Sequence, residues 1–89
     1  MVEAVHGFDN YPNPVAHQTT VRYELTRSSP VTLSILDASG RRVAELVNAR
    51  QSTGAYSVAW NATDAPAGVY YCTLQAEGRT TTRPLVVNH

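Results

Sequence analysis

The sequence predicts an all-β protein, an antiparallel β-sandwich of about seven short strands, and three observations lead to this prediction. Six segments carry strand-forming residues at alternating positions, and turn residues separate them roughly every ten residues. No segment shows the i, i+3, i+4, i+7 apolar spacing of an amphipathic helix over three turns. With 89 residues, 43% of them hydrophobic and 16% charged, the chain has the composition of one small folded domain.

The N-terminal half of the chain predicts three strands. Residues 20–25 alternate between apolar and polar side chains, residues 27–30 contain the Ser-Ser-Pro of a turn, and residues 31–35 alternate again. Residues 37–40, Asp-Ala-Ser-Gly, are a four-residue turn signal that leads into a strand over residues 41–46. The strands on either side of that turn are expected to form a hairpin.

The C-terminal half predicts three further strands and contains the longer loops. The strands are expected over residues 56–60, 69–74 and 80–87, with polar loops at 48–54 and 61–68 and a turn at 77 and 78. Residues 8–11 are the candidate for a seventh strand. Residues 1–7 are interpreted as a linker from a larger polypeptide, so the predicted domain covers residues 8–89.

The predicted core consists of the side chains that share the inward face of each strand. A strand places every second side chain on the same face, so the apolar members of each alternating run are assigned to the interior. They are Val21, Tyr23, Leu25, Val31, Leu33, Ile35, Val43, Leu46, Tyr56, Val58, Trp60, Tyr70, Cys72 and Leu74.

The composition argues against several classes of function. The formal net charge is zero and the pI is about 6.8, which favours neither nucleic acid nor an anionic membrane as a partner. No apolar run has the length of a membrane-spanning helix. His6, His17 and His89 are scattered without metal-ligand spacing, and no nucleophile, base and orienting group can be assigned. We therefore expect no enzyme activity, no metal and no cofactor.

Two motifs stand out from the strand pattern. Asn10-Tyr-Pro-Asn-Pro14 places two prolines around an asparagine, which makes the segment rigid and extended and suits a fixed lead-in from an upstream domain. Asp64-Ala-Pro-Ala-Gly-Val-Tyr70 ends a loop at a strand. There Gly68 is expected to permit a tight approach, and the Tyr70 hydroxyl to bond loop backbone as in the tyrosine corner of β-sandwiches.

A longer ordered series of motifs contains these two. It consists of Tyr11-Pro-Asn-Pro14, Thr20-Val-Arg-Tyr23, Val31-Thr-Leu-Ser-Ile-Leu-Asp37 with Gly40-Arg-Arg-Val43, Gly54-Ala-Tyr-Ser-Val58 and Ala67-Gly-Val-Tyr70. The series resembles the C-terminal sorting domain of the Por, or type IX, secretion system of Bacteroidetes-type bacteria, and the resemblance covers about residues 9 to 87. Flagellar hook-assembly proteins carry a related Ig-like domain.

The resemblance implies an Ig-like or fibronectin III-like sandwich that acts as an address and has no catalytic activity. Such domains follow an upstream cargo in the same chain. After export to the periplasm they are recognised by the outer-membrane translocation machinery, and a sortase-like surface protease then typically removes them. The resemblance therefore implies a secreted or cell-surface location, and we expect a monomer.

The resemblance also assigns roles to particular residues. Pro12, Asn13 and Pro14 set the junction with the cargo, and Gly68 and Tyr70 serve folding. The signal surface is the terminal strand, with the residues Arg83, Pro84, Leu85, Val86 and Val87. Family members usually have lysines before the apolar ending, whereas this chain has Arg79 and Arg83, and Pro84 is a departure that an edge strand tolerates.

Two other functions remain as alternatives at this point. A carbohydrate-binding module would need several exposed aromatic side chains in one plane, for which only Tyr11 and Tyr71 are candidates. A structural Ig-like accessory module of a multidomain secreted enzyme would need a following domain. Trp60 is assigned to the core rather than to a sugar platform, because it alternates with Tyr56 and Val58.

Overall fold

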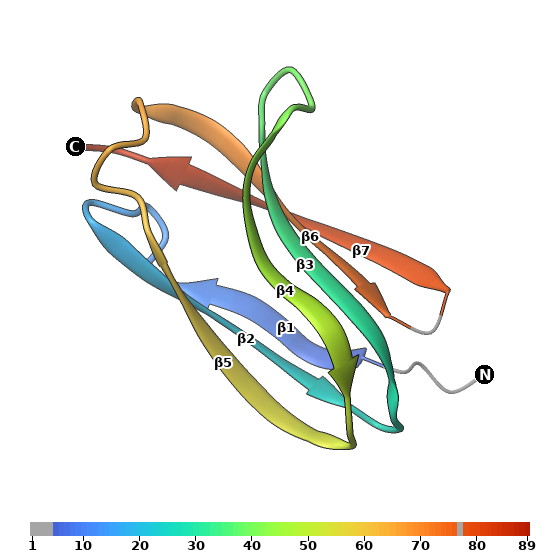
Figure 1. The fold of residues 1–89 in the computed structure, drawn as a ribbon. Coiled ribbons are helices and arrows are strands. Elements are labelled where there is room, and N and C mark those ends of the chain that lie inside the picture. The colour runs from blue at the N-terminus through green and yellow to red at the C-terminus, as the bar shows by residue number, and fades with distance from the viewer. Residues whose placement is uncertain (1–4, 77) are drawn as a thin grey trace.

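The computed structural model describes residues 5–76 and 78–89 and contains seven strands (Figure 1). The strands are β1 (Val5–Tyr11), β2 (Gln18–Leu25), β3 (Ser29–Asp37), β4 (Arg42–Gln51), β5 (Gly54–Asn61), β6 (Gly68–Ala76) and β7 (Arg79–Val87). They form an antiparallel three-stranded sheet in the order β1-β2-β5 and an antiparallel four-stranded sheet in the order β4-β3-β6-β7. The predicted sandwich of about seven strands is confirmed.

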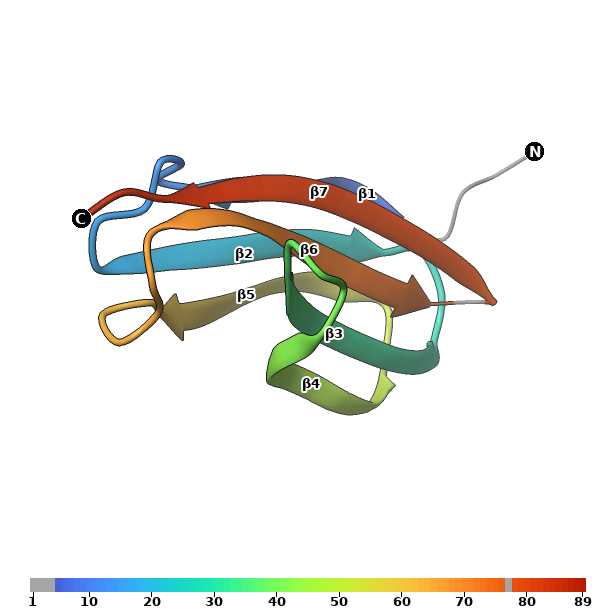
Figure 2. The same ribbon diagram turned by 90° about the horizontal axis from the view of Figure 1, so that it is seen from above.

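The arrangement of the two sheets gives the sandwich two different sides. The edge strands β1 and β7 lie on one side, and the edge strands β4 and β5 lie on the other (Figure 2). The fourth strand pairs with β3 and not with the three-stranded sheet, which agrees with the fibronectin III-like form of the prediction. The end of the chain and the loop before β2 lie together at one end of the molecule (Figure 1).

The core between the sheets contains ten of the fourteen predicted side chains as buried residues. They are Val21, Tyr23, Leu25, Val31, Leu33, Ile35, Trp60, Tyr70, Cys72 and Leu74. Burial of such side chains is the main favourable term in folding, about 1.5–3 kcal/mol for each large one. The structure adds buried residues that the alternation of the predicted strands did not include, namely Phe8, Val15, Ala62, Ala76, Leu85 and Val87.

The assignment of Val43 to the core is wrong, because this side chain is 44% exposed. The register between β3 and β4 shifts twice, between Leu33 and Ser34 and again between Ile35 and Leu36. Each such irregularity inserts an extra residue and ends the strict alternation of faces. The positions opposite Ile35 and Leu33 are therefore taken by Ala44 and Val47, which pack against the core.

The prediction of a loop over residues 48–54 is also wrong. Residues 48–51 continue β4 by pairing with the first residues of β3, and β5 begins at Gly54, so that only residues 52 and 53 connect the two strands. Gln51 is held at the end of β4 because the Tyr23 hydroxyl donates a 2.6 Å hydrogen bond to its Oε1 atom. Tyr23 also stacks on Tyr56, with the ring centroids 5.4 Å apart.

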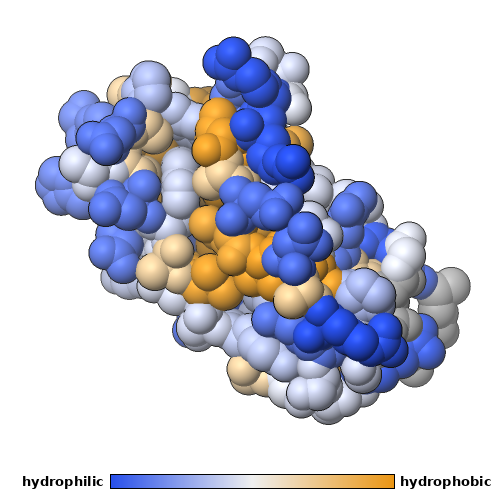
Figure 3. Space-filling model, in the orientation of Figure 1, coloured by the Kyte–Doolittle hydropathy of each residue, from blue (hydrophilic) through white to orange (hydrophobic). Residues whose placement is uncertain are grey.

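The side between β4 and β5 is only partly closed. Leu46, Tyr56 and Val58, which were predicted to lie inside, are partly buried there and pack against the core with Ala44 and Val47. Figure 3 shows the corresponding apolar band across the middle of the face on which β4 lies. This side of the sandwich is therefore lined by partly buried apolar side chains.

Several predicted boundaries move by a few residues. β1 begins at Val5, so residues 5–7, which were expected to be linker, belong to a strand. β3 begins at Ser29, so the predicted turn at residues 27–30 is shorter than expected. Residues 1–4 of the predicted linker and residue 77 of the predicted turn lie outside the described residues.

Candidate functional site

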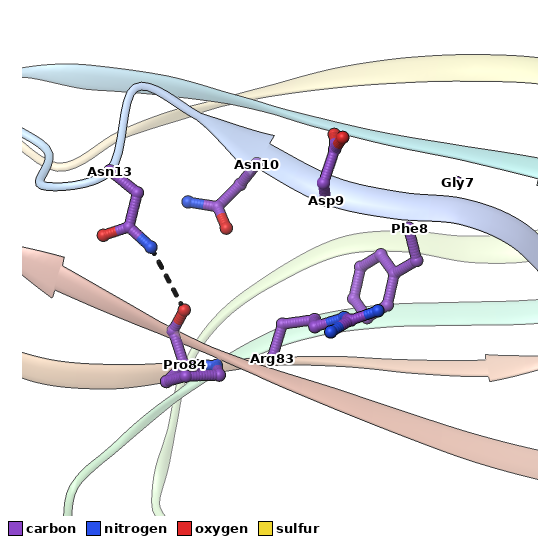
Figure 4. Close-up of a pocket in the computed structure, with 7 residues that line it drawn as sticks. All are labelled: Gly7, Phe8, Asp9, Asn10, Asn13, Arg83 and Pro84. Atoms are coloured by element: carbon purple, nitrogen blue, oxygen red, sulfur yellow. Dashed lines mark hydrogen bonds between the residues drawn. The ribbon is translucent and has the colours of Figure 1, made fainter.

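The proline-rich segment, residues 11–14, connects β1 to β2 and lies against the terminal strand β7. Two backbone groups of β7 are paired with the Asn13 side chain. Its Nδ2 atom donates to the Pro84 carbonyl at 3.3 Å, a bond drawn in Figure 4, and its Oδ1 atom accepts from the Val86 N–H at 3.0 Å. One carboxamide thus supplies the donor and the acceptor that a neighbouring strand would offer to this edge.

The chain extends this pairing immediately after Pro14. The Val15 N–H donates to the Val86 carbonyl at 2.7 Å, and the Val15 carbonyl accepts from the Asn88 N–H at 2.8 Å, which forms a short parallel bridge. The interpretation of this segment as a lead-in from an upstream domain is therefore wrong. The segment follows β1 and joins the edge of one sheet to the edge of the other. Its backbone has few N–H donors, and the pairing with β7 is made by the side chain of Asn13.

Pro84 lies at a position of β7 where the missing N–H removes no hydrogen bond to the neighbouring strand. β7 is the edge strand of its sheet, and β6 is the one strand that pairs with it in the described part of the chain, apart from the single bridge to Val15. The bonds that Val86 makes to Asn13 and Val15 point away from β6. Since backbone groups alternate in direction along a strand, the nitrogen of Pro84 also faces that outer side, and no hydrogen bond to β6 is lost.

Gly68 and Tyr70 lie at the start of β6, beside the end of β7. The Tyr70 hydroxyl donates to the Pro66 carbonyl at 2.6 Å, which confirms the predicted bond to loop backbone. The ring packs edge-on against Trp60, with centroids 5.7 Å apart. Gly68 has a φ of +153°, and a Cβ atom built on it would meet nothing within 4 Å. Backbone conformation, and not the predicted tight approach, is therefore the reason for glycine at this position.

The structure brings the predicted site residues together at one end of the sandwich. In the register of β6 and β7, Gly68 lies opposite Val87 and Tyr70 lies opposite Leu85. Leu85 and Val87 are buried members of the core, whereas Val86 between them is exposed. The C-terminal end of β7 is thus anchored by Leu85 and Val87 and presents Pro84 and Val86 to solvent.

Exposed apolar side chains gather on the outer face of β6 and β7 at this end. Val69, Tyr71 and Val86 are 44%, 37% and 38% exposed, and the register places Val69 opposite Val86 and Tyr71 opposite Pro84. We call Val69, Tyr71, Pro84 and Val86 the terminal patch. The outward direction of Tyr71 is predictable from the alternation of its strand, whereas the grouping of these residues depends on the register between β6 and β7, which neither strand determines by itself.

On the side of β1 and β7 a groove of about 550 Å³ separates the two edge strands. Its lining consists of Gly7, Phe8, Asp9, Asn10, Asn13, Arg83 and Pro84 (Figure 4), and we call it the edge groove. The Asp9 carboxylate is bonded to Arg22, with both contacts at 3.2 Å. The Asn10 Nδ2 atom is buried and has no hydrogen-bond partner. Asn10 was not among the predicted site residues.

The remaining reactive groups do not form a second site. Within residues 5–76 and 78–89, no group of three or more His, Cys, Asp or Glu side chains could hold a metal ion. Cys72 is buried, and burial raises the pKa of its thiol to about 12. A ring nitrogen of His89 lies 2.8 Å from the Ala65 carbonyl. The described part of the chain contains no helix of the length and hydrophobicity needed to cross a membrane.

Trp60 is confirmed as a core residue, since it is only 7% exposed and packs against Tyr70. Of the two tyrosines considered for sugar stacking, Tyr11 lies in the three-stranded sheet and Tyr71 in the four-stranded sheet. Tyr71 is already part of the terminal patch. The largest aromatic side chain of the protein therefore serves packing.

Comparison with known proteins agrees with this geometry. Residues 9–88 match the family model of the secretion system C-terminal sorting domain, a range that includes the proline-rich segment and the whole terminal strand. A search of curated proteins gives no match. The chain belongs to the family of type IX secretion system C-terminal sorting domains, the signals that direct a cargo in the same chain across the outer membrane to the cell surface.

Proposed function

We propose that the domain acts without enzyme activity and that the secretion machinery recognises it at the terminal patch and the adjoining end of β7. The observation that carries the proposal is the exposure of Val69, Tyr71 and Val86 side by side on one face. Contiguous exposed apolar side chains on a small domain mark a surface that another protein covers. Here that surface spans β6 and the terminal strand β7, and β7 is the strand that we expect to carry the signal.

The residues around the terminal patch have supporting roles in this proposal. Leu85 and Val87 hold β7 in the core, so that Val86 is presented in a fixed orientation. Asn13 and Val15 occupy the outer edge of the same strand, which prevents it from fraying at the end of the sheet. Pro12, Pro14, Gly68 and Tyr70 fix the two loops that flank this arrangement.

The partners in this proposal follow from the order of events in the pathway. The outer-membrane translocation machinery binds the terminal patch while the cargo upstream is carried through. A sortase-like surface protease then separates the cargo from the domain, acting on the chain before β1. The domain is a monomer in this scheme, because the patch must be free when the machinery is reached.

The proposal is tested with a reporter protein fused upstream of the chain in a host with a type IX system. Deletion of residues 80–89 should leave the reporter in the periplasm, but it also removes the core residues Leu85 and Val87. The sharper variant is therefore the double substitution Val69→Asp and Val86→Asp on the exposed face. Its matched control is Val43→Asp, an equally exposed valine on β4.

The double variant should remain folded, as checked by a thermal melt of the purified domain, and should accumulate in the periplasm. The Val43→Asp control should reach the cell surface as the unchanged chain does. Normal surface delivery of the folded double variant would show that the terminal patch is not the recognised surface. Binding of the purified domain to insoluble polysaccharide, lost with Tyr71→Ala, would instead favour a carbohydrate-binding module.

A further inference from the structure

The outer edge of β7 is covered at one end and open at the other. Asn13 and Val15 pair with Pro84, Val86 and Asn88 at the C-terminal end. The backbone groups of Thr80 and Thr82 point to the same outer side by the alternation of the strand. Within the described part of the chain, no other strand pairs with them. The N–H and C=O groups of two residues are thus available to an added strand.

The edge groove beside this open edge presents donors without acceptors. Arg83 and Phe8 both line the groove (Figure 4), and no described residue accepts a hydrogen bond from the guanidinium group of Arg83. The buried Asn10 Nδ2 atom in the same groove also has no partner. The nearest carboxylate in the lining, that of Asp9, is occupied by Arg22. The groove therefore contains unpaired hydrogen-bond donors, one of them charged, and a carboxylate is a suitable acceptor for them.

A second copy of the chain is poorly suited to this edge. Antiparallel self-pairing that uses both Thr80 and Thr82 of each copy would place Arg79 of one copy opposite Arg83 of the other. Like charges directly opposite each other destabilise a strand pair. Shifting the register toward the C-terminus would bring in Pro84, which has no N–H to donate. The edge therefore disfavours pairing with a second copy of the chain and favours a strand that carries negative charge.

We propose that the open edge of β7 accepts an extended segment of a partner protein as an additional strand, and that this segment carries a carboxylate that pairs with Arg83 in the edge groove. Strand addition of this kind obtains affinity from main-chain hydrogen bonds and specificity from alternate side chains. The inference rests on the proposed function, because it gives the chemistry of the protein that recognises β7. It places the contact on the edge of the strand, next to the terminal patch on its face.

The binding test uses the ¹⁵N-labelled 89-residue chain and a blocked heptapeptide of alternating threonine and valine with one central aspartate. The matched peptide has asparagine in place of aspartate. The aspartate peptide should shift the amide signals of residues 79–83 and the Asn10 side-chain signal, and should bind about two- to fivefold more tightly than the asparagine peptide. Arg83→Gln should abolish this preference, whereas Arg50→Gln on β4, at the opposite edge of the sheet, should preserve it.

Thr82→Pro tests the strand addition itself. It removes an outward N–H and no bond to β6, so the domain should stay folded and lose binding of both peptides. Equal affinity for the two peptides, shifts confined to β4 and β5, or undiminished binding by a folded Thr82→Pro variant would each overturn the inference. A dimer of the free chain that Thr82→Pro dissociates would assign the edge to a second copy and would overturn it as well.

A secretion experiment separates this inference from the proposed function. The reporter fusion is compared with its Thr82→Pro and Arg83→Gln variants and with the Val69→Asp, Val86→Asp double variant. Both edge variants should deliver less reporter to the surface. If only the double variant is retained in the periplasm, the terminal patch is the recognised surface and the strand-addition inference fails. If only the edge variants are retained, the terminal patch proposal fails and the strand-addition inference stands.

Discussion

The Val86 N–H donates a 3.0 Å hydrogen bond to the side chain of Asn13, which lies 73 positions earlier in the chain. The same side chain donates to the carbonyl of Pro84, two residues before Val86. Asn13 belongs to the segment after the first strand, and Val86 to the end of the last strand. The bond therefore closes the sandwich by joining the edges of its two sheets, and it occupies backbone groups that would otherwise be an open edge.

Replacing Asn13 with alanine should destabilise the domain by about 1–2 kcal/mol, because two hydrogen bonds of β7 are lost at a solvent-accessible site. Urea denaturation of both proteins measures the difference. Amide exchange at Val86 should accelerate in the variant even where the rest of β7 stays protected. The control is Asn48→Ala, an exposed asparagine on β4, which should change stability by less than about 0.5 kcal/mol. Equal effects of the two substitutions would contradict the role of Asn13.

Removing the Tyr70 hydroxyl should cost about 1 kcal/mol. Tyr70→Phe keeps the ring against Trp60 but leaves the Pro66 carbonyl without its 2.6 Å bond. Tyr71→Phe is the matched control, because this neighbouring tyrosine faces outward and should be almost neutral. Thermal denaturation of the three proteins compares them directly, and a stable Tyr70→Phe variant would show that the hydroxyl has no structural role.

Trp60→Ala should destabilise the domain by about 3–5 kcal/mol, since it leaves a cavity beside Tyr70 in the core. That is a large share of the 5–15 kcal/mol typical of a whole domain. Chemical denaturation, with tyrosine fluorescence and circular dichroism as probes, measures the loss. A fully stable variant that failed only to bind polysaccharide would return Trp60 to the surface as a ligand platform.

The strands were predictable from the sequence because each one buries a single face, so that alternation is visible in residues such as Val31, Leu33 and Ile35. The failure at Val43 has a physical cause. Two irregularities in the register of β3 and β4 change the direction of side chains along β4. The position of such an extra residue cannot be predicted from a single sequence. The loop predicted at residues 48–54 failed for a related reason. Polar residues fill an edge strand whose outer face meets water.

The candidate site was predictable in its parts and not in its assembly. Asn13, Pro84 and Val86 were chosen from separate motifs, and nothing local shows that one carboxamide joins them. Pairing between segments 71 and 73 residues apart depends on the order of strands in both sheets. Asn10 was overlooked because its importance comes from a buried donor without a partner, which only the folded groove reveals.

Cys72 should make the stability of the domain depend on pH in the alkaline range. Burial raises the pKa of its thiol from 9.0 to about 12, so the folded state keeps the proton at pH values where the unfolded chain has released it. The contribution of the thiol to stability is therefore constant below pH 9 and falls as the pH rises from 9 towards 12, by at most about 1.4 kcal/mol for each pH unit. Tyr23, whose pKa is also raised by burial, contributes in the same direction.

The comparison that isolates Cys72 is the difference between the unchanged protein and Cys72→Ala, because Tyr23 and the other groups are common to both. Urea denaturation at a series of pH values should show the two stabilities converging above pH 9, as the variant has no buried thiol to keep protonated. The folded protein should also react slowly with Ellman's reagent until it is denatured. Parallel pH profiles together with rapid labelling would place the thiol at the surface, and the inward assignment of Tyr70 and Leu74 on the same strand face would fall with it.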